Sequence, residues 1–272
     1  MVYVICLLIG LLTSFVGSLA GLGGGIILVP SLLILNTYMD AFNWATPQAI
    51  VGISLVTMVF TALSSTLAYY KKGRIDFRTG WLLLSGSIPG GIAGSWMNQF
   101  VETEQFLLFF GLLMICISLL FFIRRQTFGS KATKRRRGVR TFWIDGKTYE
   151  YTVTIGPAFL LSLFVGVMSG LFGIGGGSVM VPAMILLFGL PAHLATATSM
   201  FMILFVSLIG AGTHLALGHI MWQYAVFFIP GAWFGGKIGA FVNQRLHGRA
   251  LEWILRLLLI MIGIRMIFQG IS

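Results

Sequence analysis

Two short stretches of this chain are near copies of each other. Residues 20–30 read A-G-L-G-G-G-I-I-L-V-P, and residues 172–182 read F-G-I-G-G-G-S-V-M-V-P. In both, G-x-G-G-G interrupts an apolar run, and a proline follows. Lipid offers no hydrogen-bond partner to the backbone groups that such a break frees, so a break at membrane depth lies inside protein or beside water. Paired breaks in two halves of a chain indicate a transport site.

The composition predicts an all-α polytopic membrane protein. Hydrophobic residues make up 57% of the 272 residues and charged residues 9%. Several stretches run for about 20 residues without charge, the length that a helix needs to cross the hydrocarbon core. Of the 18 Lys and Arg residues, 13 lie in segments 71–78 and 124–150. Positive charge clustered beside spans is typical of cytoplasmic loops, so no nucleic-acid partner is expected.

The similarity between the two halves extends beyond the glycines. Residues 48–54 align with 193–199, residues 72–75 with 217–220, and the Ile-Pro-Gly of 88–90 with that of 229–231. The offset falls from 152 at the glycines to 145 and then 141, as changes in loop length would produce. The sequence therefore predicts two membrane repeats, residues 1–123 and 153–272, joined by a linker over residues 124–152. The apolar N-terminus lacks a basic n-region and is expected to be retained.

Each repeat contains one glycine-broken segment followed by three segments of spanning length. The broken segments are 2–38 and 153–189, and the spans are 44–70, 77–99, 105–123, 193–217, 222–244 and 250–270. A helix of about 37 residues would reach roughly 55 Å, which is too long for one upright span. Each broken segment is either a full span plus a half-helix or a re-entrant hairpin of two half-helices.

The distribution of charge favours the re-entrant alternative. If each broken segment is re-entrant, the repeats are inverted, and loops 71–78, 124–150 and 245–249 all lie in the cytoplasm. The acidic residues Asp40, Glu102 and Glu104 then lie outside. Within the linker, residues 141–153 alternate bulky and polar side chains around Asp-Gly, which predicts a β-hairpin. Its basic residues are expected to lie near anionic lipid headgroups, either as a positive-inside anchor or in a regulatory role.

The restarted helix after each break suits an anion. Its first N–H groups and its positive dipole end point toward the break. The alternative is that these glycines only allow close helix packing. His193, Thr196 and Ser199 fall on one stripe of a helix, as do Gln48 and Ser54 in the first half, while Thr198 lies on a neighbouring face. These polar residues can bind an oxyanion or simply join helices. The candidate binding residues are Gly23, Gly24, Gly25, Gln48, Ser54, Gly175, Gly176, Gly177, Ser178, His193, Thr196, Thr198 and Ser199.

The other ionisable residues in the spans give weaker indications of function than the glycine breaks. Lys237 lies in a Gly-rich span and is either functional or a snorkelling side chain. His214 and His219 lie near the end of a span, where they could titrate in a proton-coupled cycle. The two cysteines suggest neither a disulfide nor a metal site. No catalytic motif is present, so we expect neither an enzyme nor a cofactor.

The chain resembles the TauE/SafE sulfite exporter family, also called the TSUP family. The resemblance rests on both glycine breaks with their Val-Pro pairs, on the His193–Ser199 segment and on the two Pro-Gly sites, and it covers about 240 residues of both halves. It implies transport of sulfite, sulfonates or related organosulfur anions, often by export, in the plasma membrane. Because Gln48 replaces the second half's His193, the second half is expected to supply more of the polar contacts.

The expected mechanism is secondary transport, with the anion held between the two breaks while one half moves against the other. Two alternatives stay open. A passive anion channel would use the same helix ends, and a membrane scaffold or assembly protein would need no polar site. The oligomeric state, the coupling ion and the direction of transport are not determined by the sequence.

Overall fold

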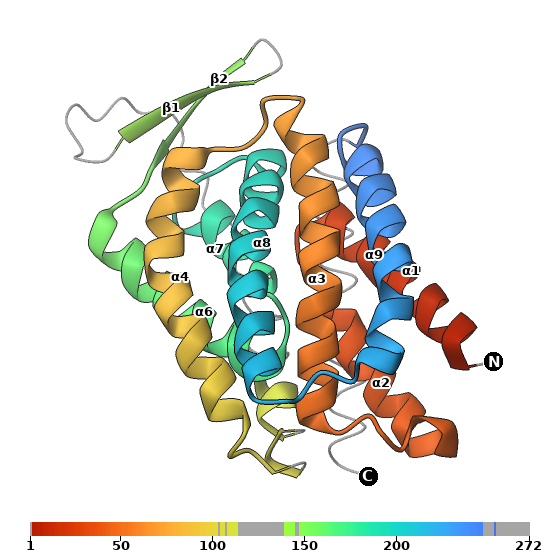
Figure 1. The fold of residues 1–272 in the computed structure, drawn as a ribbon. Coiled ribbons are helices and arrows are strands. Elements are labelled where there is room, and N and C mark those ends of the chain that lie inside the picture. The colour runs from red at the N-terminus through yellow and green to blue at the C-terminus, as the bar shows by residue number, and fades with distance from the viewer. Residues whose placement is uncertain are drawn as a thin grey trace.

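The computed structural model describes residues 2–102, 104–106, 108–113, 139–144, 147–246 and 253. Its helices are α1 Val2–Ala20, α2 Gly25–Tyr38, α3 Pro47–Tyr70, α4 Phe77–Asn98, α6 Ile155–Phe172, α7 Gly177–Leu186, α8 Ala192–Ala216 and α9 Trp222–Asn243. A 3-10 turn, η1, covers Asp40–Phe42, and the strands are β1 Val139–Ile144 and β2 Lys147–Thr152. The helices form one bundle, and the β-hairpin stands on one end of it (Figure 1). We call this the hairpin end.

Five of the described helices are long and apolar enough to cross a membrane: α1, α3, α6, α8 and α9. This agrees with the predicted multi-pass membrane protein. Helix α4 has 22 residues but carries many Gly and Ser residues, which lower its hydropathy. The predicted span 105–123 is described only up to residue 113, and the predicted span 250–270 lies outside the described residues apart from Trp253. Basic residues 124–137 of the linker also lie outside them.

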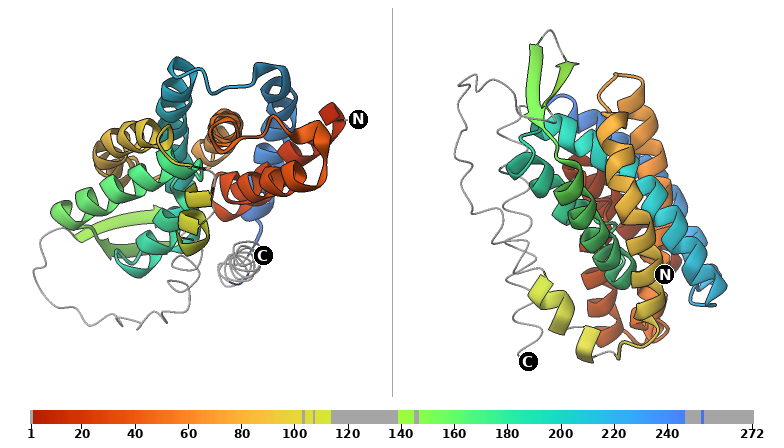
Figure 2. Two further views of the ribbon diagram at one scale, coloured as in Figure 1. Left: turned by 90° about the horizontal axis from the view of Figure 1, so that it is seen from below. Right: turned by 90° about the vertical axis from the view of Figure 1, so that its left-hand side faces the viewer.

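Both glycine-broken segments return to the end of the bundle from which they start. At the end opposite the hairpin, the rings of Tyr3 and Trp44 both contact Tyr224, with centroid distances of 6.2 and 4.1 Å. Tyr3 lies in the first turn of α1 and Trp44 follows α2 and η1, so these two residues mark the beginning and the end of the first broken segment. At the hairpin end, the Thr152 N–H donates to the Phe188 carbonyl over 3.1 Å, which joins the two sides of α6–α7. Each broken segment therefore follows the course of a hairpin (Figure 2).

Helices α3 and α8 cross at the centre of the bundle in opposite directions (Figure 1). Gly52, near the start of α3, lies against Ile220, just after the end of α8. Further along α3, Leu55 contacts Gly210 of α8. Both helices are largely buried, because the other helices surround them.

The outer helices pair between the two halves of the sequence. Gly231, Gly235 and Gly239 of α9 lie against the α1 backbone, so that an added Cβ would come within 2.4 Å of a carbonyl oxygen at each position. Gly86, Gly90 and Gly94 of α4 make the same kind of approach to α6, at 2.5 Å or less. Small residues at this spacing let membrane helices pack backbone to backbone.

These glycines correct the sequence alignment of α4 with α9. Gly90 lies against Leu163 and Val167 of α6, whereas the matching approach to α1 is made by Gly235 and not by Gly231. The offset between α4 and α9 is therefore 145, and the shared Ile-Pro-Gly sequences stand one helical turn apart. A shift of four residues keeps the same helix face, so the sequence pattern alone does not reveal it.

The hairpin is docked through a buried carboxylate at the α3–α4 turn. Its strands pair in antiparallel register with Phe142 opposite Tyr149, where the alternating pattern of residues 141–153 predicts them; the Asp-Gly turn itself lies outside the described residues. The Tyr151 hydroxyl hydrogen-bonds Asp76, and the Arg140 guanidinium donates to Thr79 over 2.6 Å. Burial, followed by the neighbouring Asp76, raises the pKa of Tyr151, which therefore remains a hydrogen-bond donor.

Candidate functional site

The two glycine breaks meet at the centre of the bundle. Gly24 and Gly176, which precede α2 and α7, have φ angles of 98° and 68°, a region that glycine adopts without steric cost. A Cβ on Gly25 would lie 2.2 Å from the carbonyl oxygen of Gly173, and a Cβ on Gly177 would lie 2.4 Å from that of Gly21. Each break therefore needs glycine both for its turn and for its contact with the other break.

Both restarted helices begin without a side-chain cap. Helices α2 and α7 have glycine at the N-cap and no side chain that accepts from their first N–H groups. By contrast, Thr46 caps α3 and Asp76 caps α4. An uncapped helix start presents backbone donors and the positive end of the helix dipole, which favours a negatively charged ligand.

Two serines join the breaks to the central helices in a reciprocal arrangement. Ser54 of α3 donates to the Gly173 carbonyl over 2.6 Å, and Ser199 of α8 donates to the Gly21 carbonyl over 2.8 Å. Both serines are buried. Each hydroxyl has one proton and uses it on a carbonyl. In this conformation the two serines therefore hold the breaks in place and do not offer a donor to a ligand.

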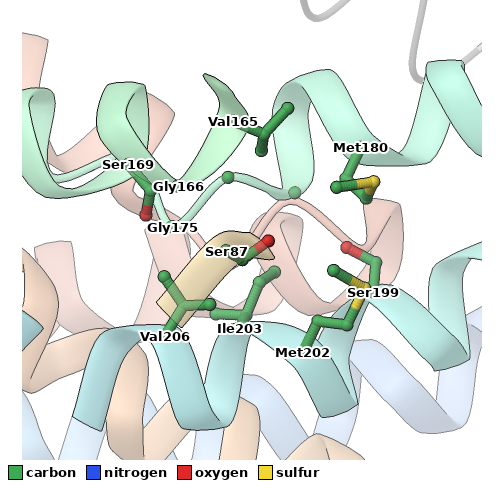
Figure 3. Close-up of a pocket in the computed structure, with 12 residues that line it drawn as sticks. Ser87, Val165, Gly166, Ser169, Gly175, Met180, Ser199, Met202, Ile203 and Val206 are labelled. Carbon is green, nitrogen blue, oxygen red and sulfur yellow. The ribbon is translucent and has the colours of Figure 1, made fainter. Parts of the chain in front are cut away.

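A cavity lies beside the second break (Figure 3). Its volume is about 10 Å³, room for about one water molecule. Residues of α4, α6, α7 and α8 bound it, with the second break on one side and α8 on the other. The lining residues are Ser87, Val165, Gly166, Ser169, Gly175, Gly176, Gly177, Met180, Ser199, Met202, Ile203 and Val206. A ligand of four or more non-hydrogen atoms does not fit into this space, so the cavity would have to widen to bind one.

Three buried hydroxyls without a partner lie at or near this cavity. The Ser169 hydroxyl lines it, Ser178 lies on the first turn of α7, and Thr196 packs against Gly21 of the first break. Among the described residues, no hydrogen bond is made by the side-chain oxygen of any of the three. Buried polar groups are nearly always hydrogen-bonded, so unpaired ones in a native site indicate a bound water or ligand.

Three of the predicted site residues lie elsewhere. Gln48 donates to the Val101 carbonyl over 3.1 Å at the end of α4, and the Thr198 hydroxyl accepts from the Asp76 N–H over 3.1 Å at the α3–α4 turn. His193 Nδ1 lies 3.5 Å from Asn243 Oδ1. None of the three lines the cavity. Gln48 and His193 lie more than a turn before Ser54 and Ser199 along their helices. Thr198 lies at the same level as the first break but faces α4, where it contacts Asp76 and Gly80.

Two asparagines that the sequence reading missed support the breaks. Asn98 donates to the Leu171 carbonyl over 2.8 Å, and Asn243 donates to the Leu19 carbonyl over 2.6 Å. Both are fully buried and hold a carbonyl of the last turn of α6 or α1, immediately before the break. The sequence does contain a signal for them, because each asparagine is followed by glutamine and the two Asn-Gln pairs are separated by 145 residues.

A cluster of hydroxyls beside the first break was also missed. Thr61 donates to Ser14 over 2.7 Å, and Ser65 donates to Ser18 over 2.6 Å, while Ser18 donates to the Gly236 carbonyl. All four hydroxyls are buried and have partners. Polar side chains around the breaks therefore come from the first half as well as from the second. The spacing of hydroxyls along α3 was the available signal.

Lys237 points away from both breaks. It is exposed on the outer face of α9, beside the exposed Trp233, Phe234 and Ile238. This position fits the snorkelling alternative, in which the ammonium group reaches the interface at the end of the helix.

The sequence of this chain is similar to those of membrane transport proteins. A model of the sulfite exporter TauE/SafE family matches residues 6–266. The probable membrane transporter protein YunE of Bacillus subtilis is 43% identical over 273 residues, which cover 100% of this chain and 99% of YunE. A probable membrane transporter protein of Xylella fastidiosa is 27% identical, over 96% of this chain and 93% of its own length. No solved structure matches the chain. The names of these relatives are those of membrane transporters and not of enzymes.

Proposed function

Because the chain belongs to the TauE/SafE sulfite exporter family, we propose that it is a secondary transporter that exports small organosulfur anions across the plasma membrane. Membrane transport itself follows from the family and from the relatives. The observation that carries the choice of an anion is the cavity at the uncapped start of α7, which the unpaired hydroxyl of Ser169 lines and beside which Ser178, with a second unpaired hydroxyl, lies in the first turn of α7.

In this proposal the anion occupies the cavity beside Gly175–Gly177, which widens to hold it. The first-turn N–H groups of α7 and the hydroxyls of Ser169 and Ser178 donate to its oxygens, so no buried positive side chain is needed. Ser199 borders the same space. When it releases the Gly21 carbonyl, its proton becomes available to the anion, which would link binding to a change at the first break.

We further propose that the two halves are inverted repeats, with the hairpin end in the cytoplasm. Support comes from the opposite directions of α3 and α8 and from the reciprocal Ser54 and Ser199 bonds. The basic turn 71–74 and Arg245 lie at the hairpin end, whereas Asp40 and Glu102 lie in loops at the other end, as the positive-inside rule requires.

The moving units in this transport cycle are not the two halves of the sequence. Moving one half against the other would separate α1 from α9 and α4 from α6, which pack backbone to backbone through glycines. We propose instead that α1, α2, α3 and α9 form one unit and α4, α6, α7 and α8 the other. Alternating access then occurs along the α3–α8 contact, on which both breaks lie.

The test is binding and flux of defined anions. Sulfite, thiosulfate and methanesulfonate are added to the purified protein, with sulfate and chloride as comparison anions. A true ligand at about 100 times its Kd should stabilise the protein by about 2.7 kcal/mol. Ser178→Ala and Ser169→Ala should weaken this shift, while Ser207→Ala, a buried serine of α8 outside the cavity, should not. If no sulfur anion raises the unfolding temperature, the substrate assignment fails.

Flux into proteoliposomes then separates a transporter from a channel. A transporter gives saturable uptake of radiolabelled sulfite and exchange between internal and external sulfite. A passive channel gives flux that does not saturate and that follows only the electrochemical gradient of the anion. Protein inserted with its hairpin end outward should take up the anion, because uptake in that orientation corresponds to export from the cell.

A further inference from the structure

A pair of histidines lies at the end of the bundle opposite the hairpin. His214 is in the last turn of α8 and fully buried, and His219 is in the loop that follows. Their Nδ1 atoms lie 3.0 Å apart, and their ring centroids lie 5.1 Å apart. Two imidazole nitrogens at this distance share one proton, because one ring must donate and the other must accept.

The other nitrogen of His214 is left without a partner. Its Nε2 atom is buried beside the backbone of Gly170 and makes no hydrogen bond of good geometry with the described residues. Gly170 belongs to the last turn of α6, where carbonyl groups and the helix dipole favour a positive charge. A second proton on His214 would therefore point an N–H at α6 just before the second glycine break.

We propose that His214 and His219 together bind one proton and that this proton is the coupling ion of the transport cycle. The inference rests on the proposed function, since it assigns the ion that moves with the anion. The proton would sit at the C-terminal end of α6 and the anion at the N-terminal start of α7, on the two sides of one break. A conformational change at that break would alter both sites at once.

The surroundings of the pair make its proton affinity dependent on conformation. From α6 it is faced by the Gly170 backbone and from α3 by Gly52, and neither has a titratable side chain. The titratable group that faces His214 is His219 itself. Burial lowers the pKa of His219 in this conformation. Opening of this end would hydrate the pair and raise its affinity for a proton, and such a difference in affinity between two states is what couples an ion to transport.

The corresponding residues of the first half do not form a second histidine pair that could bind a proton. At the offset of 145, His214 matches Tyr69 and His219 matches Arg74. Tyr69 donates its hydroxyl proton to the Ser18 carbonyl over 3.1 Å, and Arg74 has no imidazole ring to pair with it. Proton exchange would therefore occur only at the end opposite the hairpin. The pair is also a poor metal site, because no third His, Cys, Asp or Glu joins it among the described residues.

The test measures proton movement driven by an anion gradient. Proteoliposomes containing a trapped pH dye are given an outward sulfite gradient without any imposed pH gradient. The wild type should show a change in internal pH that requires sulfite. His214→Gln and His219→Gln should lose most of this signal, while they retain exchange of internal for external sulfite at constant pH. Thr213→Ala, next to the pair but without a titratable group, should behave as the wild type.

The possible outcomes separate the two proposals. If the wild type moves no sulfur anion, the proposed function fails. If the wild type moves sulfite without a proton signal, or if both Gln variants keep the full signal, the coupling site is refuted and the proposed function stands. If a chelator abolishes the signal in the wild type, the pair binds a metal ion and the proton assignment is wrong. A variant that fails to fold is recognised by loss of sulfite exchange, and His214→Tyr, which restores the residue of the first half, then replaces it.

Discussion

Replacing Ser199 by alanine should destabilise the contact between α8 and the first glycine break. The Ser199 hydroxyl donates to the Gly21 carbonyl over 2.8 Å, and its side chain is almost fully buried. Alanine leaves the packing nearly unchanged, so the main effect is a buried carbonyl without its donor, which costs about 1–3 kcal/mol. For a chain of this size, each kcal/mol lowers the midpoint of thermal unfolding by about 2–4 °C. We therefore expect a decrease of at least about 2 °C.

A matched control is available in the same helix. Ser207 is also fully buried in α8, but its hydroxyl donates to the Ile203 carbonyl of its own helix over 2.6 Å. Such a bond within a helix contributes little, because the carbonyl is already part of the helix ladder. Ser207→Ala should change the free energy of unfolding by less than about 0.5 kcal/mol.

The assay is thermal unfolding of the wild type, Ser199→Ala and Ser207→Ala, measured by intrinsic fluorescence in one detergent at one protein concentration. Ser54→Ala should behave as Ser199→Ala, because Ser54 makes the reciprocal bond to Gly173 over 2.6 Å. Equal unfolding temperatures for Ser199→Ala and Ser207→Ala would refute the reasoning, since they would show that the serine does not hold the break.

Three further changes test other parts of the structure. Asn98→Ala should lower the free energy of unfolding by about 1–3 kcal/mol in chemical or thermal unfolding, because it leaves the buried Leu171 carbonyl without a donor; an unchanged value would contradict the assigned bond. Gly177→Ala should cost about 1–3 kcal/mol or more and remove sulfite binding in a thermal-shift assay, because its Cβ would lie 2.4 Å from the Gly21 carbonyl; Gly212→Ala, with nothing within 4 Å of an added Cβ, is its control. Because burial lowers the pKa of His219, the unfolded chain binds more protons below about pH 6.5, so the wild type should lose stability as the pH falls from about 7 to about 5.5. His219→Gln should lose less, and identical pH profiles would exclude this contribution.

Much of the fold can be predicted because it depends on local patterns. The G-x-G-G-G breaks predict irregular backbone inside the protein, and the alternation around Asp-Gly predicts the strands Val139–Ile144 and Lys147–Thr152. The stripe that includes Ser54 and Ser199 also predicts side chains near the breaks. Their partners, Gly173 and Gly21, could not be predicted, because each serine bonds to the opposite half and the sequence contains no information on which helix packs against which.

The features that the sequence did not predict share one physical cause. Two helices can pack in the same way after one of them is shifted by a full turn along its axis, because the same residue types face the contact. The Ile-Pro-Gly sequences match in letters but stand one turn apart, since the glycines that contact α6 and α1 recur every four residues. Asn98 and Asn243 were overlooked because a lone asparagine near the end of a span is also typical of an interface residue. Only the packing shows that each holds the carbonyl before a break.

The two breaks differ in the side chains that surround them. The sequence suggests that the second half has more polar side chains, but the structure shows another difference. Around the first break, Ser14 and Thr61 fill the space and satisfy each other. At the corresponding positions near the second break stand Gly166 and Val206, which leave the cavity open and the Ser169 hydroxyl unpaired. In the proposed function, the second half would therefore form the better site because it lacks hydroxyls that would fill the cavity, not because it has more of them. Gly166→Ser together with Val206→Thr should transfer the first half's residues to the second, close the cavity and abolish sulfite binding. Because a Cβ on Gly166 would lie 2.4 Å from the Ser87 carbonyl oxygen, this variant should also be less stable than the wild type. Gly86→Ala is its control, because it disturbs the same α4–α6 contact outside the cavity and should therefore lose stability but keep sulfite binding. If the double variant still bound sulfite in the thermal-shift assay, the anion site would lie elsewhere.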